Sequence, residues 1–323
     1  MMDLSIVLVN YKAADLCIQC VKSIKDHAAG FSYEIIIVDN QSEDGSKENV
    51  LGVHPDVRWF DMGYNAGFSR ANNLGLENAL GEYILFLNTD TLLLDNVLLD
   101  CLQRLRADSA ISACSVFMLD EKGEPNPVDP NYTIEGIATY AFIPTRNPST
   151  PWVKRKVEAL RKRLGNQKQD FLLGAFIMTK RELVIKVGGF DPNQFLYGED
   201  VDLSCKLAEL GNLAYFEDLK IIHLEGGSTP VGGKPLTFFP RPQMHLANLV
   251  FLRNWLGADY FLLVMLNYYL FIPVYFLIRI IKGLIKGNLY AELRAPIQFA
   301  RQVSRWSDYF FTILRQRPAF YKY

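Results

Sequence analysis

Three carboxylates lie within four residues at Glu199, Asp200 and Asp202, directly behind an aromatic stretch of the chain. Like charges this close together repel each other, and burial raises the pKa of a carboxyl, so the cluster is costly unless the protein uses it. Taken alone, the cluster also fits a helix N-terminus, where acidic residues favour the positive end of the helix dipole. Asp90 upstream and His223 downstream favour a functional site over that alternative.

The sequence Asn88-Thr89-Asp90 ends an apolar run, which is a typical place for a ligand of a hard divalent cation. Mg²⁺ takes one or two carboxylates from a protein and draws its other ligands from substrate phosphates and water. A lone histidine such as His223 is more often a packed residue, but Leu219–His223 has the pattern of a strand end and could present a ligand. The combination predicts a diphosphate leaving group held by Mg²⁺ or Mn²⁺, with a nearby carboxylate as general base.

The elements that must position these residues follow from apolar runs that alternate with amphipathic segments. The expected strands are Leu4–Val9, Glu34–Asp39 and Tyr83–Leu87, and the expected helices are Asp15–Ile24, Arg70–Leu80 and Asp95–Leu105. Continuous β-branched runs with helices between them indicate a parallel sheet covered on both faces. Polar residues follow the strands at Asn10, Asp39, Asn40 and Asn88, and open α/β sheets bind ligands at that carboxyl edge.

A second group of residues could complete a ligand pocket at this edge. The carboxylate of Asp39 could accept a hydrogen bond from a base N–H, while the Asn and Ser side chains that follow it could meet a ribose. The turn Gly63–Phe68 permits close backbone approach, and Arg70 and Asn72 just after it could reach a phosphate or a sugar hydroxyl.

Composition places the chain among globular proteins with a bias toward membranes. Its 323 residues suffice for one large domain plus an appendage. From Arg279 to Tyr323, nine Lys and Arg stand against two acids, so this tail carries +7 and the rest of the chain −8. Such a basic tail indicates a membrane surface or another polyanion as partner. Five scattered cysteines indicate reduced thiols in the cytosol, and the N-terminus lacks the basic start and apolar core of a signal peptide.

The second half of the chain contains three further segments. Residues 120–150, rich in Pro, Asn and Thr, are expected to form a long loop. Trp152–Lys168 is expected to be a helix with seven basic residues and one acid, which fits a solvated face or a helix lying on anionic lipid. Tyr260–Ile278 is uncharged for 19 residues, long enough to span a bilayer. Because Asn267 and Pro273 interrupt it and a basic tail follows, we favour an in-plane or re-entrant segment, with a single span as the alternative.

The motifs together resemble a family 2 glycosyltransferase of the GT-A fold, specifically the bacterial rhamnosyltransferase-like group. The matching stretches lie in order between Ser5 and Thr229: SIVLVNYKA, IIIVDNQSEDGS, GYNAGFSRANNLGLENALGEYILFLNTDT, GAFIMTKRELVIKVGGFDPNQFLYGEDVDLSCKLAELG and HLEGGST. The resemblance implies a GT-A fold with a mostly parallel central sheet over residues 1–235. Residues 236–323 then form a C-terminal helical, membrane-associated region.

The resemblance also implies a role for individual residues. Asp200 matches the catalytic base and Glu199 its neighbour, while Asp90 and His223 match the ligands of the divalent metal. The implied nucleotide-sugar pocket is lined by Asn10, Asp39, Asn40, Asn65, Gly67, Arg70, Asn72, Asn88 and Gly174. Two positions depart from the family pattern: Asn88 stands at the first position of its DxD motif, and Lys206 stands where relatives often carry Arg.

The resulting hypothesis is an inverting, metal-dependent transferase of cell-surface polysaccharide synthesis. It would move a sugar, first of all rhamnose from dTDP-L-rhamnose, onto a hydroxyl of a glycan or a polyprenyl-diphosphate-linked saccharide at the cytoplasmic face of the cell membrane. No nucleic acid partner is expected. The alternatives are a UDP-hexose donor on the same fold, or a non-catalytic membrane-associated scaffold that binds nucleotide sugars.

Overall fold

The computed structural model describes residues 2–126, 133–143, 150–224 and 241–323. The chain divides into two compact units. The first comprises Met1–Asp129, Arg163–Phe195 and Glu199–Val231, and the second Pro130–Lys162, Leu196–Gly198 and Gly232–Tyr323. The predicted domain boundary between residues 235 and 236 lies outside the described residues and stays a prediction.

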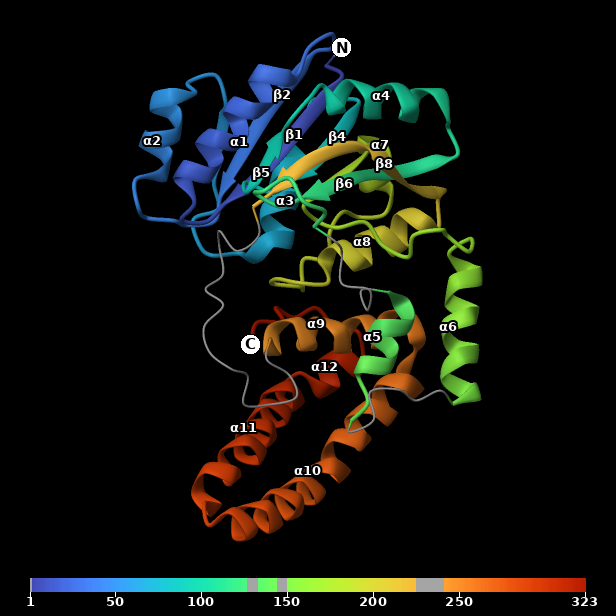
Figure 1. The fold of residues 1–323 in the computed structure, drawn as a ribbon. Coiled ribbons are helices and arrows are strands. Elements are labelled where there is room, and N and C mark those ends of the chain that lie inside the picture. The colour runs from blue at the N-terminus through green and yellow to red at the C-terminus, as the bar shows by residue number, and fades with distance from the viewer. Residues whose placement is uncertain (1, 127–132, 144–149, 225–240) are drawn as a thin grey trace. The chain divides into compact units, whose positions relative to one another are not determined.

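The first unit is built on one sheet whose described strands follow the order β3-β2-β1-β4-β7-β6-β8-β5 (Figure 1). The strands are β1 (Leu4–Asn10), β2 (Tyr33–Asp39), β3 (Arg58–Asp61), β4 (Tyr83–Leu87), β5 (Thr91–Leu93), β6 (Ile111–Leu119), β7 (Phe176–Lys180) and β8 (Asn212–His223). All three strands predicted from apolar runs are present, because a segment buried on both faces must be apolar throughout.

The predicted mostly parallel sheet is present, and β6 pairs parallel with β8 in its second half. β1 pairs parallel with β2 and β4, and β2 pairs parallel with β3. β7 runs antiparallel to both β4 and β6, and β5 runs antiparallel to β8. Strand direction depends on partners far away in the sequence, so the apolar runs alone did not reveal these reversals. The reversal also places the start of β7 beside the end of β4, since Phe176 pairs with Leu87.

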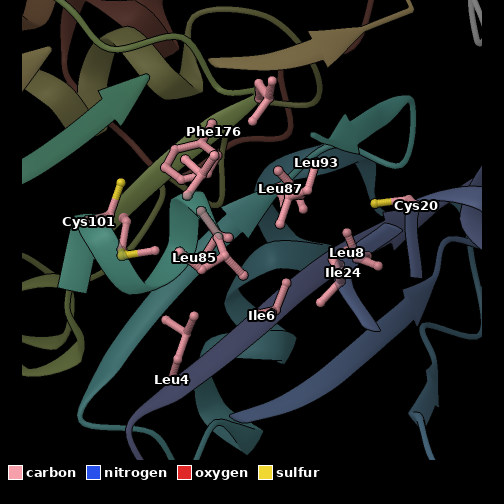
Figure 2. Close-up of a cluster of buried hydrophobic side chains, with 14 of the residues drawn as sticks. Leu4, Ile6, Leu8, Cys20, Ile24, Leu85, Leu87, Leu93, Cys101 and Phe176 are labelled. Carbon is pink, nitrogen blue, oxygen red and sulfur yellow. The ribbon is translucent and has the colours of Figure 1, made fainter. Parts of the chain in front are cut away.

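Helices cover both faces of this sheet, as predicted. On one face, α1 (Ala14–His27), α2 (Ser46–Val53) and α4 (Val97–Ala107) bury their apolar sides against alternate strand residues. Figure 2 shows this core, with Ile24 and Cys20 of α1 beside Leu8 and Leu87 of the sheet. On the other face, α3 (Gly67–Asn78) approaches so closely that a Cβ at Gly75 would lie 2.3 Å from Val7. Here α8 (Glu199–Ala208) lies against β6 and β8.

Two predicted segments differ from the structure at particular points, and one helix was not predicted. The predicted loop over 120–150 contains a helix, α5 (Ile134–Tyr140). Thr133 caps the start of this helix, because its side chain accepts a hydrogen bond from Gly136 N at 2.9 Å. The helix predicted over Trp152–Lys168 is α6 (Pro151–Arg163), and it ends before Gly165, which has a φ of +79°. α7 (Arg181–Lys186) was not predicted.

The second unit is helical in its described part. Besides α5 and α6 it contains α9 (Pro242–Phe251), a π-helical turn (Leu252–Leu256), α10 (Ala258–Lys286), α11 (Leu289–Asp308) and α12 (Phe310–Leu314). The predicted apolar segment Tyr260–Ile278 lies inside α10, which continues through Pro273 to Lys286. By its length and composition α10 is the one helix among the described residues that could cross a membrane.

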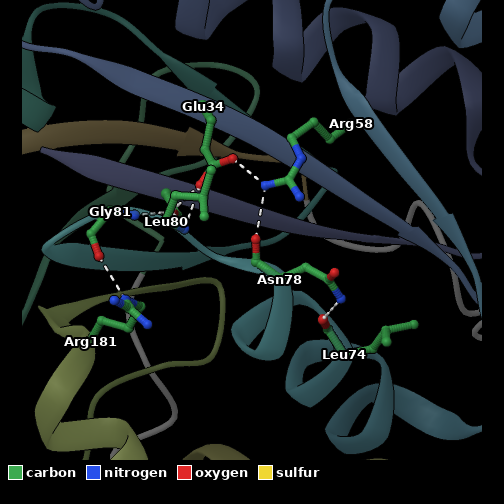
Figure 3. A network of polar contacts seen from close by, with 8 residues as sticks. Glu34, Arg58, Leu74, Asn78, Leu80, Gly81 and Arg181 are labelled. Carbon is green, nitrogen blue, oxygen red and sulfur yellow. Dashed lines mark hydrogen bonds and ion pairs between the residues drawn. The ribbon is translucent and has the colours of Figure 1, made fainter. Parts of the chain in front are cut away.

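The amino-terminal edge of the sheet is closed by a polar network (Figure 3). The Glu34 carboxylate accepts hydrogen bonds from the Ser5 hydroxyl at 2.6 Å, from Leu80 N at 2.7 Å and from the Arg58 guanidinium. Arg58 also donates to the Asn78 carbonyl at 2.8 Å. Burial by itself raises the pKa of Glu34, but these donors outweigh it and the pKa is lowered. This edge is therefore a structural joint between β1, β2 and the turn that precedes β4.

Candidate active site

Asp39 anchors a buried cluster at the carboxyl ends of β1 and β2. Its Oδ1 accepts a hydrogen bond from Asn10 Nδ2 at 2.7 Å and its Oδ2 accepts one from Ser42 N at 2.9 Å. The Ser42 hydroxyl donates to the same carboxylate and accepts from Lys12 N at 2.9 Å. Paired parallel strands place Asn10 opposite Asp39, so the sheet register itself brings these predicted residues together.

Asn40 connects this cluster to the turn before α3. Its Oδ1 accepts a hydrogen bond from Ala66 N at 2.7 Å, and its Nδ2 donates to Asn65 Oδ1 at 3.1 Å. The Gln41 side chain accepts from Asn65 N at 3.1 Å. The two turns that the sequence analysis assigned to one nucleotide pocket are thus tied to each other by side-chain amides.

A cavity of about 240 Å³ opens beside Asp39. It is lined by Asp39, Gln41, Ser42, Glu43, Asp44, Gly45, Ser46, Lys47, Glu48, Asp61 and Gly63. Five of these residues are acidic and Lys47 is the one base, so the lining offers many hydrogen-bond acceptors and repels phosphate. Such a lining suits the N–H and O–H donors of a base and a ribose.

Three residues predicted for the pocket have well-defined partners inside the protein. The space that a Cβ at Gly67 would need is occupied by the Phe195 carbonyl oxygen, 2.2 Å away, so this glycine permits two chain segments to meet. Arg70 donates from Nε to the Pro192 carbonyl at 2.7 Å and from Nη1 to the Tyr64 hydroxyl at 3.2 Å. Asn72 is 1% exposed and donates to the Phe68 carbonyl in its own helix at 3.0 Å.

Asp90 and His223 face each other where β4 passes into β5. Thr91 of β5 pairs with His223 of β8, and Leu224 N donates to the Asp90 carbonyl at 2.8 Å. His223 Nε2 lies 3.3 Å from Asp90 Oδ1, with 15% and 13% of the two side chains exposed. Residues 133 positions apart in the chain therefore form one partly exposed pair, as the sequence analysis expected of them.

Gly174 and Ala175 join this pair to the acidic cluster. Gly174 N donates to Asp200 Oδ2 at 3.0 Å, and the carbonyl of Ala175 accepts from Asn88 N at 3.1 Å. A Cβ on Gly174 would lie 3.2 Å from the Asp200 Cβ and 3.3 Å from its Oδ2, so the absence of a side chain permits this approach. Two consecutive residues thus hold the Asn88-Thr89-Asp90 turn and Asp200 in a fixed relation.

The members of the acidic cluster differ in their surroundings. Glu199 is buried, and within the described residues its Oε2 accepts no hydrogen bond. Burial and the neighbouring Asp200 raise the pKa of Glu199 from 4.5 to about 8, so it keeps its proton at neutral pH. Asp200 is half-buried and accepts hydrogen bonds from Gly174 N and Val201 N.

Asp202 and Lys206 belong to the structure of α8. Asp202 Oδ2 lies 2.7 Å from Lys206 Nζ, one turn further along the helix, and Lys206 also donates to the Gly189 carbonyl at 3.3 Å. Asp202 lies in the first turn of α8, as the helix-terminus interpretation requires. Lys206, which departs from the family pattern, therefore has a structural pairing here.

The residues at this site suit a divalent cation that takes few of its ligands from the protein. Among the described residues no group of three or more His, Cys, Asp and Glu side chains gathers as a metal cage. Asp90, in the turn before β5, and His223, at the end of β8, supply a carboxylate oxygen and an imidazole nitrogen, both partly exposed. Hard cations that bind nucleotides take few protein ligands and complete their coordination with phosphate oxygens and water, which matches this donor set.

The structure adds contacts that the sequence analysis did not foresee. Ser42, one of the residues expected near the ribose, bonds to Asp39, Asn10 and Lys12. Gln41 and Ala175 contribute through a side-chain oxygen and a backbone carbonyl. No sequence pattern marks a backbone carbonyl as a hydrogen-bond partner, so the bond from Asn88 N to Ala175 could be found only in the folded protein.

Comparison with known proteins shows a family for this chain. The family described as "Glycosyl transferase family 2" matches residues 5–188. An N-acetylglucosaminyl-diphospho-decaprenol L-rhamnosyltransferase of Mycobacterium tuberculosis is 25% identical over 216 residues, covering 60% of this chain and 67% of the relative. A low-salt glycan biosynthesis hexosyltransferase of Haloferax volcanii is 25% identical over 218 residues, covering 65% and 63%. The chain thus spans about two-thirds of these relatives.

Solved structures share the fold. A mannosyltransferase of Pyrobaculum calidifontis, solved with GDP-Man and Mn²⁺, superposes with a TM-score of 0.52 at 17% identity, covering 95% of this chain and 86% of that one. Residues 1–349 of TarS of Staphylococcus aureus, solved with UDP-GlcNAc, give a TM-score of 0.52 at 15% identity, covering 83% and 66%. The predicted GT-A fold with a mostly parallel sheet and a long apolar C-terminal helix is confirmed.

Proposed function

Because the chain belongs to glycosyl transferase family 2, we propose that it is an inverting transferase that moves a sugar from a nucleotide-diphosphate donor to an acceptor hydroxyl. The leading donor is dTDP-L-rhamnose, and a UDP-hexose is the alternative. The rhamnosyl choice draws support from the L-rhamnosyltransferase of Mycobacterium tuberculosis among the relatives.

One observation carries the proposal. Gly174 and Ala175 tie Asp200 to the Asn88-Thr89-Asp90 turn, and Asp90 in turn faces His223. A transferase of this kind needs a base at the acceptor side and charge neutralisation at the leaving group, both fixed relative to the anomeric carbon. The hydrogen bonds of Gly174 and Ala175 fix Asp200 relative to the Asn88-Thr89-Asp90 turn and so meet this requirement.

The proposed reaction uses one displacement. Asp200 accepts the proton of the acceptor hydroxyl while that oxygen attacks the anomeric carbon from the face opposite the diphosphate. The bond between the anomeric carbon and the diphosphate oxygen breaks, and the nucleoside diphosphate leaves with the electron pair. Attack from the opposite face inverts the configuration. The protonated Glu199 adds no negative charge beside Asp200 and offers a hydrogen-bond donor to the acceptor.

The remaining residues hold the donor. The acidic cavity beside Asp39 receives the base and the ribose, while Asn10 holds Asp39 in place and Asn40 and Asn65 tie the two neighbouring turns together. A divalent cation bound by Asp90 and His223 would neutralise charge on the diphosphate. Asn88 and Gly174 border the sugar, and Gly67, Arg70 and Asn72 support the turn that closes the pocket.

The acceptor is proposed to be a glycan or a polyprenyl-diphosphate-linked saccharide in cell-surface polysaccharide synthesis, met at the cytoplasmic face of the membrane. Support comes from the decaprenol-linked substrate named for the Mycobacterium tuberculosis relative and from the apolar helix α10. The predicted lipid contact of α6 remains a proposal as well.

Asp200→Asn tests the assignment of the base. The variant is expected to lose transfer by about 10²- to 10⁴-fold, the usual contribution of a general base, while nucleoside diphosphate with Mn²⁺ still raises its melting temperature. Asp202→Asn, on the same helix turn but paired with Lys206, is the matched control and should transfer normally. Near-normal turnover of purified Asp200→Asn would refute the role of Asp200, and a panel of nucleotide sugars on the wild type identifies the donor.

A further inference from the structure

α10 and α11 form an antiparallel hairpin in the second unit (Figure 1). Gly287, with a φ of +67°, ends α10, and the Asn288 side chain caps α11 by accepting a hydrogen bond from Ala291 N at 3.2 Å. Aromatic rings fill the seam between the helices, where Tyr268, Phe271 and Tyr275 of α10 pack against Phe299 of α11. The two helices therefore move as one element.

The side of α10 that points away from α11 is apolar along the whole helix. Eleven large apolar side chains on it are at least 36% exposed: Leu262, Leu263, Leu266, Leu270, Val274, Leu277, Ile278, Ile280, Ile281, Leu284 and Ile285. Ile285, near the hairpin tip, is 81% exposed. A continuous apolar surface of this extent marks an interaction site in a soluble or peripheral protein.

The cationic side chains of α10 near the tip gather on the side of α11. Arg279 and Lys286 form ion pairs with Glu292 of α11 at 3.0 and 3.3 Å, and Lys282 interacts electrostatically with the same carboxylate. The ion pairs leave the outer surface of α10 without charge. Burial of that surface in hydrocarbon would therefore desolvate none of these groups.

The outer side of α11 is basic. Arg294, Arg301 and Arg305 follow one another at helical spacing and are exposed. Gln298, Arg301, Ser304, Arg305 and Tyr323 line a hollow of about 430 Å³ with no acidic residue among them. The Arg305 guanidinium lies over the Tyr323 ring, 5.1 Å from its centroid. These arginines lie on the side of α11 opposite Phe299, which faces α10, so the basic side of the hairpin points away from its apolar side.

We propose that this hairpin docks on a phospholipid bilayer from one side only, with the outer face of α10 among the acyl chains and the arginines of α11 in water on the far side. Packed helices lie about 8–10 Å apart, and an interfacial helix buries its apolar face about 5–10 Å below the headgroups, so α11 stays at the headgroup level or above it. The inference deepens the proposed membrane-bound function.

The packing of α11 on α10 argues against a transmembrane hairpin. If α10 spanned the bilayer, α11 would accompany it, and Arg301, twelve residues after Leu289, would lie about 18 Å from the tip. That depth is close to the middle of a hydrocarbon layer about 30 Å thick, where an arginine facing lipid is costly. The single span suggested by the sequence of α10 alone is therefore disfavoured by its partner helix.

Vesicle sedimentation of the full chain tests the docking. The pair Leu277→Glu with Ile285→Glu places charges on the apolar face and should lower binding to phosphatidylglycerol–phosphatidylcholine vesicles at least about tenfold. The matched control is Val53→Glu with Ile185→Glu, which changes two residues of similar exposure in the first unit. Unchanged binding, or a change from dimer to monomer without loss of vesicle binding, would overturn the proposal.

The far side is tested by Arg301→Gln with Arg305→Gln. Because these arginines point away from the bilayer, binding to vesicles with phosphatidylglycerol should change no more than it does with Lys186→Gln and Lys220→Gln in the first unit. A loss of binding to anionic vesicles alone, to the level found with neutral vesicles, would contradict this orientation. Sedimentation measures membrane binding without measuring sugar transfer. A protein that binds vesicles but transfers no sugar would therefore contradict the proposed function and leave this inference intact.

The one-sided orientation is tested by Tyr290→Cys at the hairpin tip, since Tyr290 is 78% exposed and all five native cysteines are buried. A membrane-impermeant maleimide added to intact cells should not label this thiol. Labelling from outside the cell would show that the hairpin crosses the membrane and would overturn the proposal.

Discussion

The pKa values of two glutamates, at opposite edges of the same sheet, are shifted in opposite directions. At the amino-terminal edge, Glu34 accepts hydrogen bonds from Ser5, Leu80 and Arg58, and its pKa is lowered although burial opposes this. At the carboxyl edge, Glu199 is buried beside Asp200 without a cationic partner among the described residues, and its pKa is raised. Burial therefore does not decide the charge of a carboxyl; the donors around it do.

The network around Glu34 stabilises the fold, whereas the acidic cluster around Glu199 lowers the stability of the protein. Glu34 and Arg58 form a closed network whose donors and acceptors are matched (Figure 3). Glu199 and Asp200 bring two acids together, an arrangement that is unfavourable for folding and that suits proton transfer. Four substitutions put this comparison to the test.

The largest expected effect is at the structural edge. Arg58→Met removes the donor to Glu34 and leaves a buried carboxylate short of a partner, which should cost about 2 kcal/mol of unfolding free energy, less than for a fully buried pair because Arg58 is 36% exposed. Urea denaturation at pH 7 measures the loss. Lys22→Met breaks the exposed pair with Asp26 and should cost under about 0.5 kcal/mol. Equal losses in the two variants would show that the network adds no stability.

The next effect is a gain in stability at the catalytic edge. The pKa of Glu199 is 4.5 in the unfolded chain and about 8 in the folded protein. Between these two pH values the folded protein holds a proton that the unfolded chain has lost. The free energy of unfolding therefore falls as the pH rises through this range. Glu199→Gln removes that loss and should be more stable than the wild type by about 1–2 kcal/mol at pH 8, with no difference at pH 4.

Glu34→Gln is the opposing variant. Because the folded pKa of Glu34 is lowered, its contribution is present above pH 4.5 and disappears as the pH falls below that value. This variant should therefore be less stable than the wild type at pH 7 and should converge with it in acid. Parallel pH profiles for both glutamine variants would contradict the contrast between the two edges.

The smallest effect concerns the backbone that positions Asp200. Gly174→Ala places a Cβ 3.2 Å from the Asp200 Cβ, so the carboxylate must shift by a few tenths of an ångström. Such a displacement should lower kcat about tenfold, because rates depend steeply on the geometry of reacting groups, with a small change in melting temperature. Gly52→Ala, where a Cβ meets nothing within 4 Å, is the control and should leave kcat unchanged. A Gly174→Ala enzyme with normal kcat would separate this contact from catalysis.

Much of the fold could be predicted because its signals are local. The apolar runs of β1, β2 and β4 and the periodicity of α1, α3 and α4 lie within short windows, and the parallel pairing of β1 and β2 follows from the helix between them. The antiparallel β7 and β5 were missed because strand direction there depends on distant partners. Thr133 marked the start of α5 within a segment expected to be a loop, and that local signal was overlooked.

For the candidate site, the sequence by itself determined which residues follow the strands: Asn10, Asp39 and Asn40 lie at strand ends wherever the sheet forms. Only the tertiary structure brought His223 to Asp90 and tied Asp200 to Gly174, since these contacts join segments far apart in the chain. The raised pKa of Glu199 likewise depends on desolvation, which exists only once the surroundings are packed. The same holds for α10, whose sequence permits a span and whose packing against the arginine-rich α11 favours the membrane surface.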